Sequence, residues 1–347
     1  MTLNTQKLDM YQLQPYLEEH VEGFEGICTA EKFPGGQSNP TFKLTAGGRH
    51  YVLRRKPPGE LLASAHAVDR EYRVLRALQD TDVPVPRVYC LCEDDSVIGS
   101  SFYVMEYLDG RVFWDPTLPE IGSRDGRVAI YDEMNRVLAA IHNVDVEAVG
   151  LGDYGKPGNY FARQISRWSR QYRASETEHS PAMEILMAWL PENIPPEEER
   201  SYLVHGDYRL DNVMFHPTEA RIIAVLDWEL STLGSPMGDL AGQVMGWMFP
   251  GIGPIPGLGE KSREEIGIPT NQDYVTRYCE RTGREGVDNW PFYLAYSIFR
   301  ACGIIQGVKK RMLSGNASSA DGKALEFDVD SVAQRGVALI TADSSKQ

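Results

Sequence analysis

Two short segments of this chain carry side chains whose types and spacing suit one kind of chemistry. They read His-Gly-Asp-Tyr-Arg-Leu-Asp-Asn over 205–212 and Leu-Asp-Trp-Glu over 226–229. Asp207 and Asn212 fall in a loop expected between two short apolar strands, and Asp227 follows a third apolar run. Carboxylate and amide oxygens at strand ends are ligands that Mg²⁺ prefers. Phosphoryl transfer needs such ligands and a carboxylate near the attacking hydroxyl, so the pattern favours that chemistry, although a lone Asp is more often a turn residue.

Hydrophobic periodicity divides the chain into a strand-rich first part and a mainly helical second part. In the first part, strands are expected at 27–33, 41–44, 51–54, 88–92 and 102–107, with helices at 8–22 and 64–78. In the second, helices are expected at 125–142, 160–176, 181–190, 236–249, 271–282 and 290–313, with strands at 202–204, 213–215 and 221–226. The sequence therefore predicts two domains, 1–107 for nucleotide binding and 111–347 for the catalytic loop and the substrate, joined by a hinge at 108–110.

Composition narrows the classes of partner. The 347 residues carry a net charge of -14, which disfavours nucleic acid as a partner because such binding needs a basic surface. No run of 18 apolar residues predicts a membrane span, and the first residues lack the features of a secretory signal. The five cysteines are scattered without zinc spacing, which is typical of a reduced, cytoplasmic protein. We expect a small-molecule partner, and the sequence leaves the oligomeric state open.

The order of these features resembles the aminoglycoside phosphotransferase-like branch of the protein-kinase-like fold, over about 30–330. Within it, the chain is most similar to the kinase domains associated with acyl-CoA dehydrogenases, which phosphorylate hydroxy-acyl substrates. The segments 51–59, 102–107 and 160–167 carry this closer resemblance. The resemblance implies an α+β, two-lobed fold, with a small antiparallel-sheet N-lobe and a larger, mainly helical C-lobe. It also implies ATP and Mg²⁺ as cofactors.

The resemblance assigns roles to the loop residues. Asp207 would be the catalytic base that orients the acceptor hydroxyl, and Asn212 and Asp227 would bind Mg²⁺. We expect His205 to anchor the loop backbone rather than react. Asp211 is expected to order the loop through neighbouring N–H groups, and Asp239 to cap a helix.

Arg54 stands where kinase-like enzymes carry a strand lysine that contacts the nucleotide phosphates. Its expected partner is Glu71, which falls in an apolar stripe with Val68 and Leu75. An unpaired carboxylate in such a stripe is costly to bury, and a cation from a neighbouring strand would satisfy it. A planar guanidinium is not equivalent to a lysine ammonium, so the sequence leaves open whether Arg54 or Arg55 contacts the phosphates.

Two further segments are expected to bind ATP. The turn formed by Gly35, Gly36, Gln37, Ser38 and Asn39 could cover the phosphates with backbone N–H groups, although an ordinary hairpin turn would look the same. The second segment would bind the adenine: Met105 would lie at the back of the pocket, and Glu106 with backbone groups near the hinge would contact the edge of the adenine ring. The alternative is that this segment is simply a buried strand. Its members are Met105, Glu106, Tyr107 and Leu108.

Residues 160–175 contain four arginines and no acidic residue. Arg163, Arg167, Arg170 and Arg173 fall on one side of the expected helix, opposite an apolar face. The pattern suits either a solvated basic face or recognition of an anionic substrate. The Gly- and Pro-rich segment 250–259 is either a substrate lid or an exposed connector.

These features predict an ATP- and Mg²⁺-dependent small-molecule O-phosphotransferase, with a hydroxylated carboxylic acid or acyl compound as the preferred acceptor. An aminoglycoside or amino-sugar acceptor is the alternative within the same enzyme class. A nucleotide-binding module without turnover is the alternative outside it, because the glycine turn is short and the strand lysine is replaced. No Ala-Pro-Glu sequence follows Asp227, which disfavours a protein kinase.

Overall fold

The computed structural model describes residues 8–33, 39–57, 67–249, 257–258, 262–314 and 328–344. The chain divides into two compact units, which are described separately. The first unit comprises Met1–Arg111, Val149–Leu151 and Met214–Leu230. The second comprises Val112–Ala148, Gly152–Val213 and Ser231–Gln347. The lobe and hinge boundaries predicted from the sequence remain a proposal.

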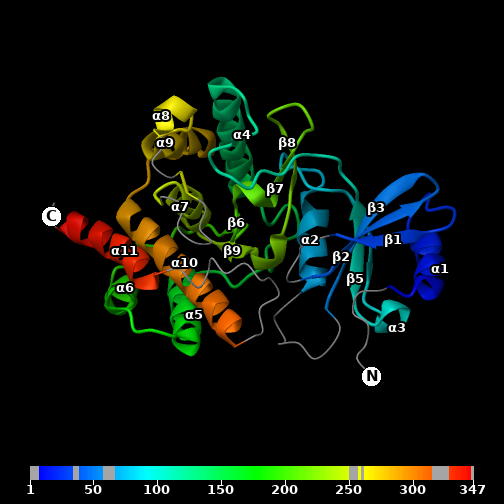
Figure 1. Ribbon diagram of the computed structural model, residues 1–347, viewed down its shortest axis with the longest axis horizontal. Helices are drawn as coiled ribbons and strands as arrows, with labels where there is room; N and C mark the ends of the chain where they lie inside the picture. Colours follow the sequence, from blue (N-terminus) through cyan, green and yellow to red (C-terminus); the bar gives the residue numbers. More distant parts are fainter. Residues whose placement is uncertain are drawn as a thin grey trace. The chain divides into compact units, whose positions relative to one another are not determined.

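The first unit is built on a five-stranded antiparallel sheet with the order β1-β2-β3-β5-β4 (Figure 1). Its strands are β1 (Thr29–Lys32), β2 (Thr41–Ala46), β3 (Arg49–Arg55), β4 (Val88–Cys92) and β5 (Phe102–Glu106), and its helices are α1 (Met10–His20), α2 (Val68–Leu78) and the short α3 (Asp95–Ile98). Gly47 and Gly48 make the β2–β3 turn with φ of 54° and 77°, a backbone region that glycine enters without cost. This tight turn brings β2 and β3 directly into antiparallel register, from Thr41 opposite Arg54 to Ala46 opposite Arg49.

A core of apolar side chains holds α1 against the sheet. Leu13 and Leu17 of α1 are fully buried in it together with Phe42, Leu53 and Phe102 from three strands. The later segment of this unit contains β8 (Ile222–Val225), which pairs with β7 (Val213–Phe215), and the 3-10 turn η2 (Trp228–Leu230). Val225 N–H donates to the Pro84 carbonyl, which fixes the end of β8 just before the Asp-Trp-Glu motif.

The second unit is mainly helical, and α10 (Trp290–Leu313) packs against four other helices. These are α5 (Tyr160–Ser175), α6 (Pro181–Glu192), α7 (Met237–Gly246) and α11 (Val329–Ser344). The remaining elements are α4 (Arg124–Asn143), α8 (Arg263–Ile266), α9 (Asn271–Thr282), the 3-10 turn η1 (Leu210–Asn212), and the strand pair β6 (Tyr202–Val204) and β9 (Thr232–Gly234). Buried residues lie all round α10, as expected for a helix at the centre of a bundle.

The predicted α+β, kinase-like architecture is confirmed, with a small antiparallel sheet and a separate helical unit. The elements that the sequence-based prediction missed include β9, α11 and the short α3. Helix α11 contains Gly336, a weak helix former, but its lack of a side chain allows close packing. A methyl group there would come within 3.1 Å of Leu186 Cδ1. Within the described residues, no helix has the length and apolar character needed to cross a membrane.

Candidate functional site

The loop between β6 and β7 holds Asp207 and Asn212 in contact. The Asn212 side-chain amide donates to the Asp207 carboxylate, with 3.0 Å between Nδ2 and Oδ2, and to the Asp207 backbone carbonyl at 2.9 Å. The Asp207 N–H donates to His205 Nδ1 at 3.2 Å, and the His205 side chain is fully buried. His205 therefore braces the loop backbone, as the sequence predicts. Gly206 has a φ of 83°, which turns the chain sharply before Asp207.

Asp239 of α7 fixes the start of this loop. Its carboxylate accepts hydrogen bonds from the backbone N–H groups of His205 at 2.6 Å and Gly206 at 2.9 Å, and it lies 3.4 Å from His142 Nε2. The prediction that Asp239 caps its own helix is wrong, because α7 has no side-chain cap and Asp239 bonds instead to a distant loop. Burial raises the pKa of Asp239, but the hydrogen bond and charge of His142 and the groups of His205 outweigh burial and lower it.

A cavity of about 270 Å³ lies beside Asp207, within the second unit. Its lining is largely apolar and includes side chains from α4, α7 and α10 as well as the loop. Among them are Tyr131, Trp247, Ile304, Ile305 and Val308. Trp114 also lines it and is 72% exposed, an unusual position for so large an apolar side chain. The cavity can hold a small molecule with an apolar body next to the Asp207 carboxylate.

Two arginines line the same cavity. Arg209 forms two hydrogen bonds with Asp211, so Asp211 pairs with a side chain rather than with the loop N–H groups expected from the sequence. Arg300 of α10 donates to the Gly206 carbonyl. The sequence-based reasoning missed Arg300, because an arginine within the mainly apolar run 291–308 has no basic neighbour that marks it.

In the first unit, Arg54 is surrounded by carboxylates. Its Nε lies 2.8 Å from Glu71 Oε2, and its Nη2 lies 2.7 Å from Asp227 Oδ1 and 3.8 Å from Glu229 Oε2. The predicted pairing of Arg54 with Glu71 is confirmed. Arg55 is buried on the other side of β3, where it donates to the Ile98 carbonyl at 3.5 Å. Of the two arginines, Arg54 is therefore the one that belongs to the charged cluster.

Neutral donors complete the surroundings of Glu71. Asn39 Nδ2 and the Tyr103 hydroxyl each donate to its carboxylate at 3.0 Å, and the side chain is 2% exposed. Burial raises the pKa of Glu71 to about 7 against the opposing charge of Arg54, and the nearby carboxylates of Asp227 and Glu229 add to the rise. Burial lowers the pKa of Arg54, but Glu71 and other neighbours outweigh it and raise the pKa.

The same cluster could hold a divalent cation. Glu71, Asp227 and Glu229 each offer an oxygen, and these oxygens lie within 4.8 Å of one another. Three carboxylates against one guanidinium leave an excess of negative charge, and oxygen donors suit Mg²⁺. Asp227 has a φ of 62°, a strained backbone position of the kind that gathers at functional sites. Glu229 was missed as a site residue, although the Asp-Trp-Glu motif contains it.

The structure separates the predicted metal ligands between the two units. Asn212 and Asp207 belong to the second unit, and Asp227 belongs to the first. Their predicted meeting around a shared ion therefore stays a prediction.

The predicted nucleotide-binding residues belong to the first unit. Gly35, Gly36, Gln37 and Ser38 lie outside the described residues. Met105 and Glu106 end β5, and Glu106 accepts a hydrogen bond from the Arg87 N–H at 3.3 Å. The Tyr107 ring lies 4.3 Å from Lys43 Nζ, and Leu108 follows it, half-buried. Their roles at the adenine remain predictions.

The arginine stripe lies on the outer side of α5, opposite the buried face formed by Phe161, Ile165 and Trp168. Arg163 donates to the Lys156 carbonyl at 2.7 Å, and Arg167 lies over the Trp168 ring. None of Arg163, Arg167 and Arg170 lines the cavity beside Asp207. Of the predicted lid at 250–259, all but residues 257–258 lies outside the described part of the chain.

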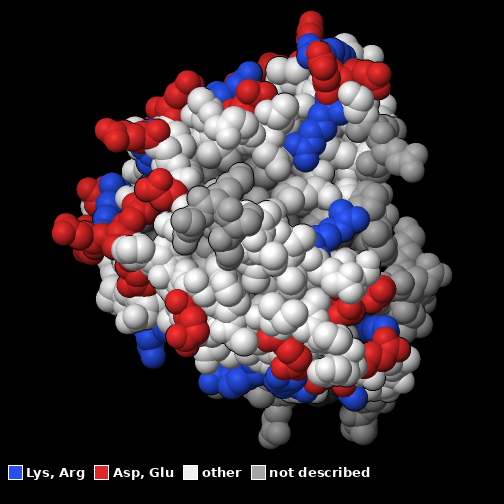
Figure 2. All heavy atoms as spheres, turned by 90° about the vertical axis from the view of Figure 1, so that its left-hand side faces the viewer, with Lys and Arg blue, Asp and Glu red and all other residues white. Residues whose placement is uncertain are grey.

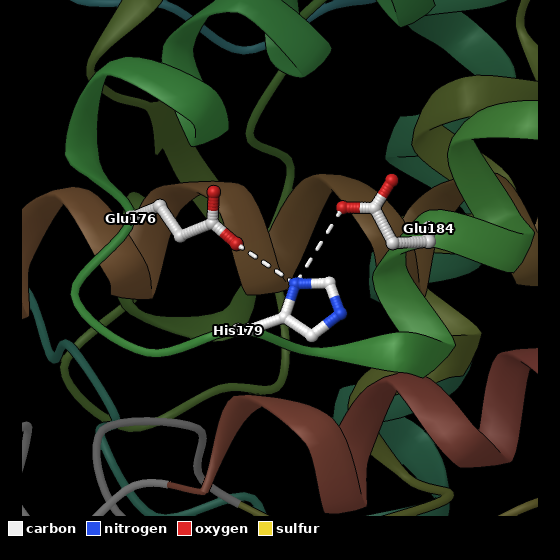
Figure 3. A group of neighbouring side chains, drawn as sticks. All are labelled: Glu176, His179 and Glu184. Carbon is white, nitrogen blue, oxygen red and sulfur yellow. Dashed lines mark ion pairs between the residues drawn. The ribbon is translucent and has the colours of Figure 1, made fainter.

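A second group with metal-like spacing lies at the end of α5. His179 Nδ1 is 3.7 Å from Glu176 Oε1 and 4.0 Å from Glu184 Oε1 (Figure 3). Arg173 already forms ion pairs with both glutamates, so the group is best described as a surface ion-pair network. On the face shown in Figure 2, acidic and basic side chains are likewise interspersed, mostly near its edge.

Known proteins similar to this chain include acyl-CoA dehydrogenase family members and an antibiotic kinase. Acyl-CoA dehydrogenase family member 10 of Mus musculus is 48% identical over 313 residues, and family member 11 of Homo sapiens is 43% identical over 338. These matches cover 88% and 96% of this chain but only 29% and 43% of the relatives, so the chain spans less than half of their length. The hygromycin-B 4-O-kinase of Escherichia coli is 24% identical over 64% of the chain and 63% of its own length.

Solved structures show the same fold. A crystal structure from Ralstonia eutropha, named provisionally as an aminoglycoside phosphotransferase, is 52% identical, with a TM-score of 0.88 over 97% of this chain and 99% of that one. A spectinomycin phosphotransferase in complex with ADP and spectinomycin is 14% identical, with a TM-score of 0.60 over 96% and 99%. The family model described as the phosphotransferase enzyme family matches residues 29–279. This match covers most of the chain and agrees with the fold, so the chain belongs to the phosphotransferase enzyme family.

Proposed function

We propose that the chain is an ATP- and Mg²⁺-dependent O-phosphotransferase whose acceptor is a small molecule with a hydroxyl group. The observation that carries the proposal is the placement of the Asp207 carboxylate, oriented by Asn212, at the wall of a cavity of about 270 Å³. Membership of the phosphotransferase enzyme family supports it. A spectinomycin phosphotransferase of the same fold has been solved in complex with ADP and spectinomycin, which supports a nucleotide as the phosphate donor here.

In this proposal, Asp207 accepts the proton of the acceptor hydroxyl as the hydroxyl oxygen forms a bond to the γ-phosphorus. The bond between the γ-phosphorus and the bridging oxygen breaks, and ADP leaves. Asn212 keeps one Asp207 oxygen in place through its amide, which leaves the other oxygen for the hydroxyl. The fixed position of the carboxylate spares the reaction a reorganisation cost.

Asn212 and Asp227 would hold Mg²⁺, with Glu229 as an additional ligand. When bound, Mg²⁺ neutralises charge on the β- and γ-phosphates. Arg54 would then leave Asp227 for the nucleotide phosphates, while Glu71 keeps the guanidinium in place from its buried side.

The rest of the nucleotide would bind through the segments predicted from the sequence. The turn 35–39 would cover the phosphates. Met105, Glu106, Tyr107 and Leu108 would meet the adenine.

The proposed acceptor is a hydroxylated carboxylic acid or acyl compound. Its apolar part suits the aromatic and branched side chains that line the cavity. The relatives named as acyl-CoA dehydrogenase family members carry a domain similar to this chain beside other sequence, which supports an acyl acceptor. Aminoglycosides and related amino sugars remain the alternative acceptors.

The test is a measurement of ATP consumption over hydroxy acids, their CoA esters and amino sugars, with ATP binding measured by calorimetry with and without Mg²⁺. We expect Asp207→Ala to lose about 10²- to 10⁴-fold in turnover while its affinity for ATP is retained. Asp273→Asn is the control, since Asp273 lies at an exposed position of α9 and does not line the cavity. Turnover at the parent rate in Asp207→Ala would remove the base assignment, and ATP binding without turnover on any acceptor would favour a binding module.

A further inference from the structure

The charged residues that line the cavity are unequally neutralised. Asp211 and Arg209 satisfy each other, and Asp239 is held by two backbone N–H groups and His142. Asp207 and Arg300 remain. Under the proposed function Asp207 serves the acceptor hydroxyl, so Arg300 is the lining charge whose purpose that function leaves unexplained.

Arg300 is held in position without being saturated. One of its nitrogens, Nη2, donates to the Gly206 carbonyl, and its guanidinium carbon lies 5.5 Å from the centre of the Trp168 ring. Among the described residues, no carboxylate forms an ion pair with Arg300, in contrast with Arg209. A guanidinium has five N–H donors in a planar fork, so donors remain for a second partner.

The position of Arg300 sets where that partner must lie. Gly206, its backbone partner, immediately precedes Asp207 in the chain, and both Arg300 and Asp207 belong to the cavity lining. An acceptor that places its hydroxyl at Asp207 would therefore bring a group a few bonds away towards Arg300. That group must accept hydrogen bonds, since arginine only donates.

We propose that Arg300 is a specificity-determining residue that binds an acyl oxygen of the acceptor, a carboxylate oxygen or a thioester carbonyl, within a few bonds of the phosphorylated hydroxyl. This inference rests on the proposed function and narrows its acceptor. The apolar remainder of the acceptor lies along Ile304, Ile305 and Val308, which follow Arg300 on α10. Because most of the exposed lining of the cavity is apolar, a hydrogen bond to a cation discriminates strongly there.

The experiment combines protein variants with matched acceptors. The acceptors are hydroxyhexanoates with the hydroxyl at different carbons, their N-acetylcysteamine thioesters, and hexanediols that lack the acyl oxygen. The variants are Arg300→Met, which removes all donors, and Arg300→Lys, which keeps the charge but not the fork. Arg335→Met is the control, because Arg335 also donates to a backbone carbonyl and lies over an aromatic ring, Phe249, but does not line the cavity.

We expect Arg300→Met to raise the KM for the acids or thioesters about 10- to 100-fold. The hexanediols should change by less than about threefold, since their second hydroxyl is an uncharged, freely rotating acceptor that the guanidinium binds more weakly than an acyl oxygen. The KM of Arg300→Lys for the acids or thioesters should lie between those of the parent and Arg300→Met, and the KM of Arg335→Met should equal that of the parent. A larger loss with the acid than with the thioester would identify a carboxylate as the partner, and the reverse would identify the thioester carbonyl.

Equal losses on acids, thioesters and diols would overturn the inference and assign Arg300 a role only in bracing the Gly206 carbonyl. If Arg300→Met folds poorly, the affinities of the parent and of Arg300→Lys for the acceptors can be measured by calorimetry without ATP. These two proteins are enough for the comparison. Acyl compounds that bind both proteins no better than the diols would also reject the inference. Failure of the proposed function would look different, since the parent would then transfer phosphate to no acceptor at all.

Discussion

Glu71 in the first unit and Asp239 in the second are both buried carboxylates, yet their pKa values move in opposite directions. Burial raises the pKa of Glu71 to about 7 against the opposing charge of Arg54, and the negative charges of Asp227 and Glu229 add to the rise. Arg54 also pairs with Asp227 and lies near Glu229. Burial also acts on Asp239, but the hydrogen bond and charge of His142, together with the charge and backbone N–H of His205, overcome it and lower the pKa. A carboxylate that has its own hydrogen-bond donors stays ionised. The ionisation of a carboxylate that shares its cation depends instead on what the neighbouring carboxylates bind.

The opposite pKa shifts of Glu71 and Asp239 show that charge is balanced differently in the two units. The loop of the second unit is held before any ligand arrives, because its backbone N–H groups donate to the fixed Asp239 carboxylate. The cluster of the first unit has an excess of carboxylates, and its charge balance would change when a cation binds. We therefore expect variants in the second unit to affect the folded protein itself, and variants in the first to affect mainly its response to ligand.

The largest expected effect is that of Asp239→Asn. The amide cannot accept from both backbone N–H groups as the carboxylate does, and a buried donor left unsatisfied costs about 1–3 kcal/mol. We expect the free energy of unfolding at pH 7 to fall by this amount and turnover to fall with it, as measured by urea unfolding and by assay. Asp273→Asn, at an exposed position of α9, is the matched control.

The same interaction of Asp239 should also make the free energy of unfolding depend on pH. Because the folded pKa of Asp239 lies below its usual value of 3.8, the unfolded chain binds the proton first as the pH falls. Its stabilising contribution is present above pH 3.8 and is lost below it. Asp239→Asn should lack this loss of stability below pH 3.8. An acid unfolding curve of the variant with the same loss as the parent would contradict the role given to Asp239.

The next effect concerns Mg²⁺ in the first unit. We expect Mg²⁺ with ATP to raise the unfolding temperature of the parent, since saturation at about 100 times the dissociation constant contributes about 2.7 kcal/mol. Asp227→Asn should lose most of this rise while its unfolding temperature without ligand changes little. Thermal scans with MgATP and with ATP plus EDTA make the measurement, and an unchanged MgATP response in the variant would separate Asp227 from the metal.

A smaller effect is expected from Glu71→Gln. Because the folded pKa of Glu71 is raised from the usual 4.5 to about 7, its contribution to stability is fully present below pH 4.5 and is lost as the pH rises through 7. The parent should therefore lose at most about 1.4 kcal/mol per pH unit across this window. Glu71→Gln should flatten the dependence, as read from unfolding curves without Mg²⁺. A slope of the opposite sign in the parent would show that Arg54 dominates the site.

The smallest effect is expected from charge reversal of Arg163 and Arg170. These side chains do not line the cavity, so any influence on an acidic acceptor acts through solvent and is screened by salt. We expect the double variant to raise the KM for such an acceptor no more than about threefold, and only at low ionic strength. A large, salt-independent rise would place these arginines in the acceptor site.

Part of this organisation can be predicted from local sequence. The strands and loop around Asp207 follow from apolar runs and turn residues, and the Arg54–Glu71 pair follows from a carboxylate that the helix places in its own apolar stripe. Helix α11 could not be predicted in this way, because its glycine is explained only by the side chains of other helices that it packs against.

The sequence by itself determined the motifs, the spacing of Asp207 and Asn212, and the alternation of strands and helices, because these depend on neighbours along the chain. Only the tertiary structure decided that Asp239 holds the backbone of a distant loop and that Arg300 shares a cavity with Asp207. Asp239 lies more than 30 residues from the groups it binds, and Arg300 lies more than 90 residues away. Contacts over such separations depend on how helices pack, and no local periodicity records that packing.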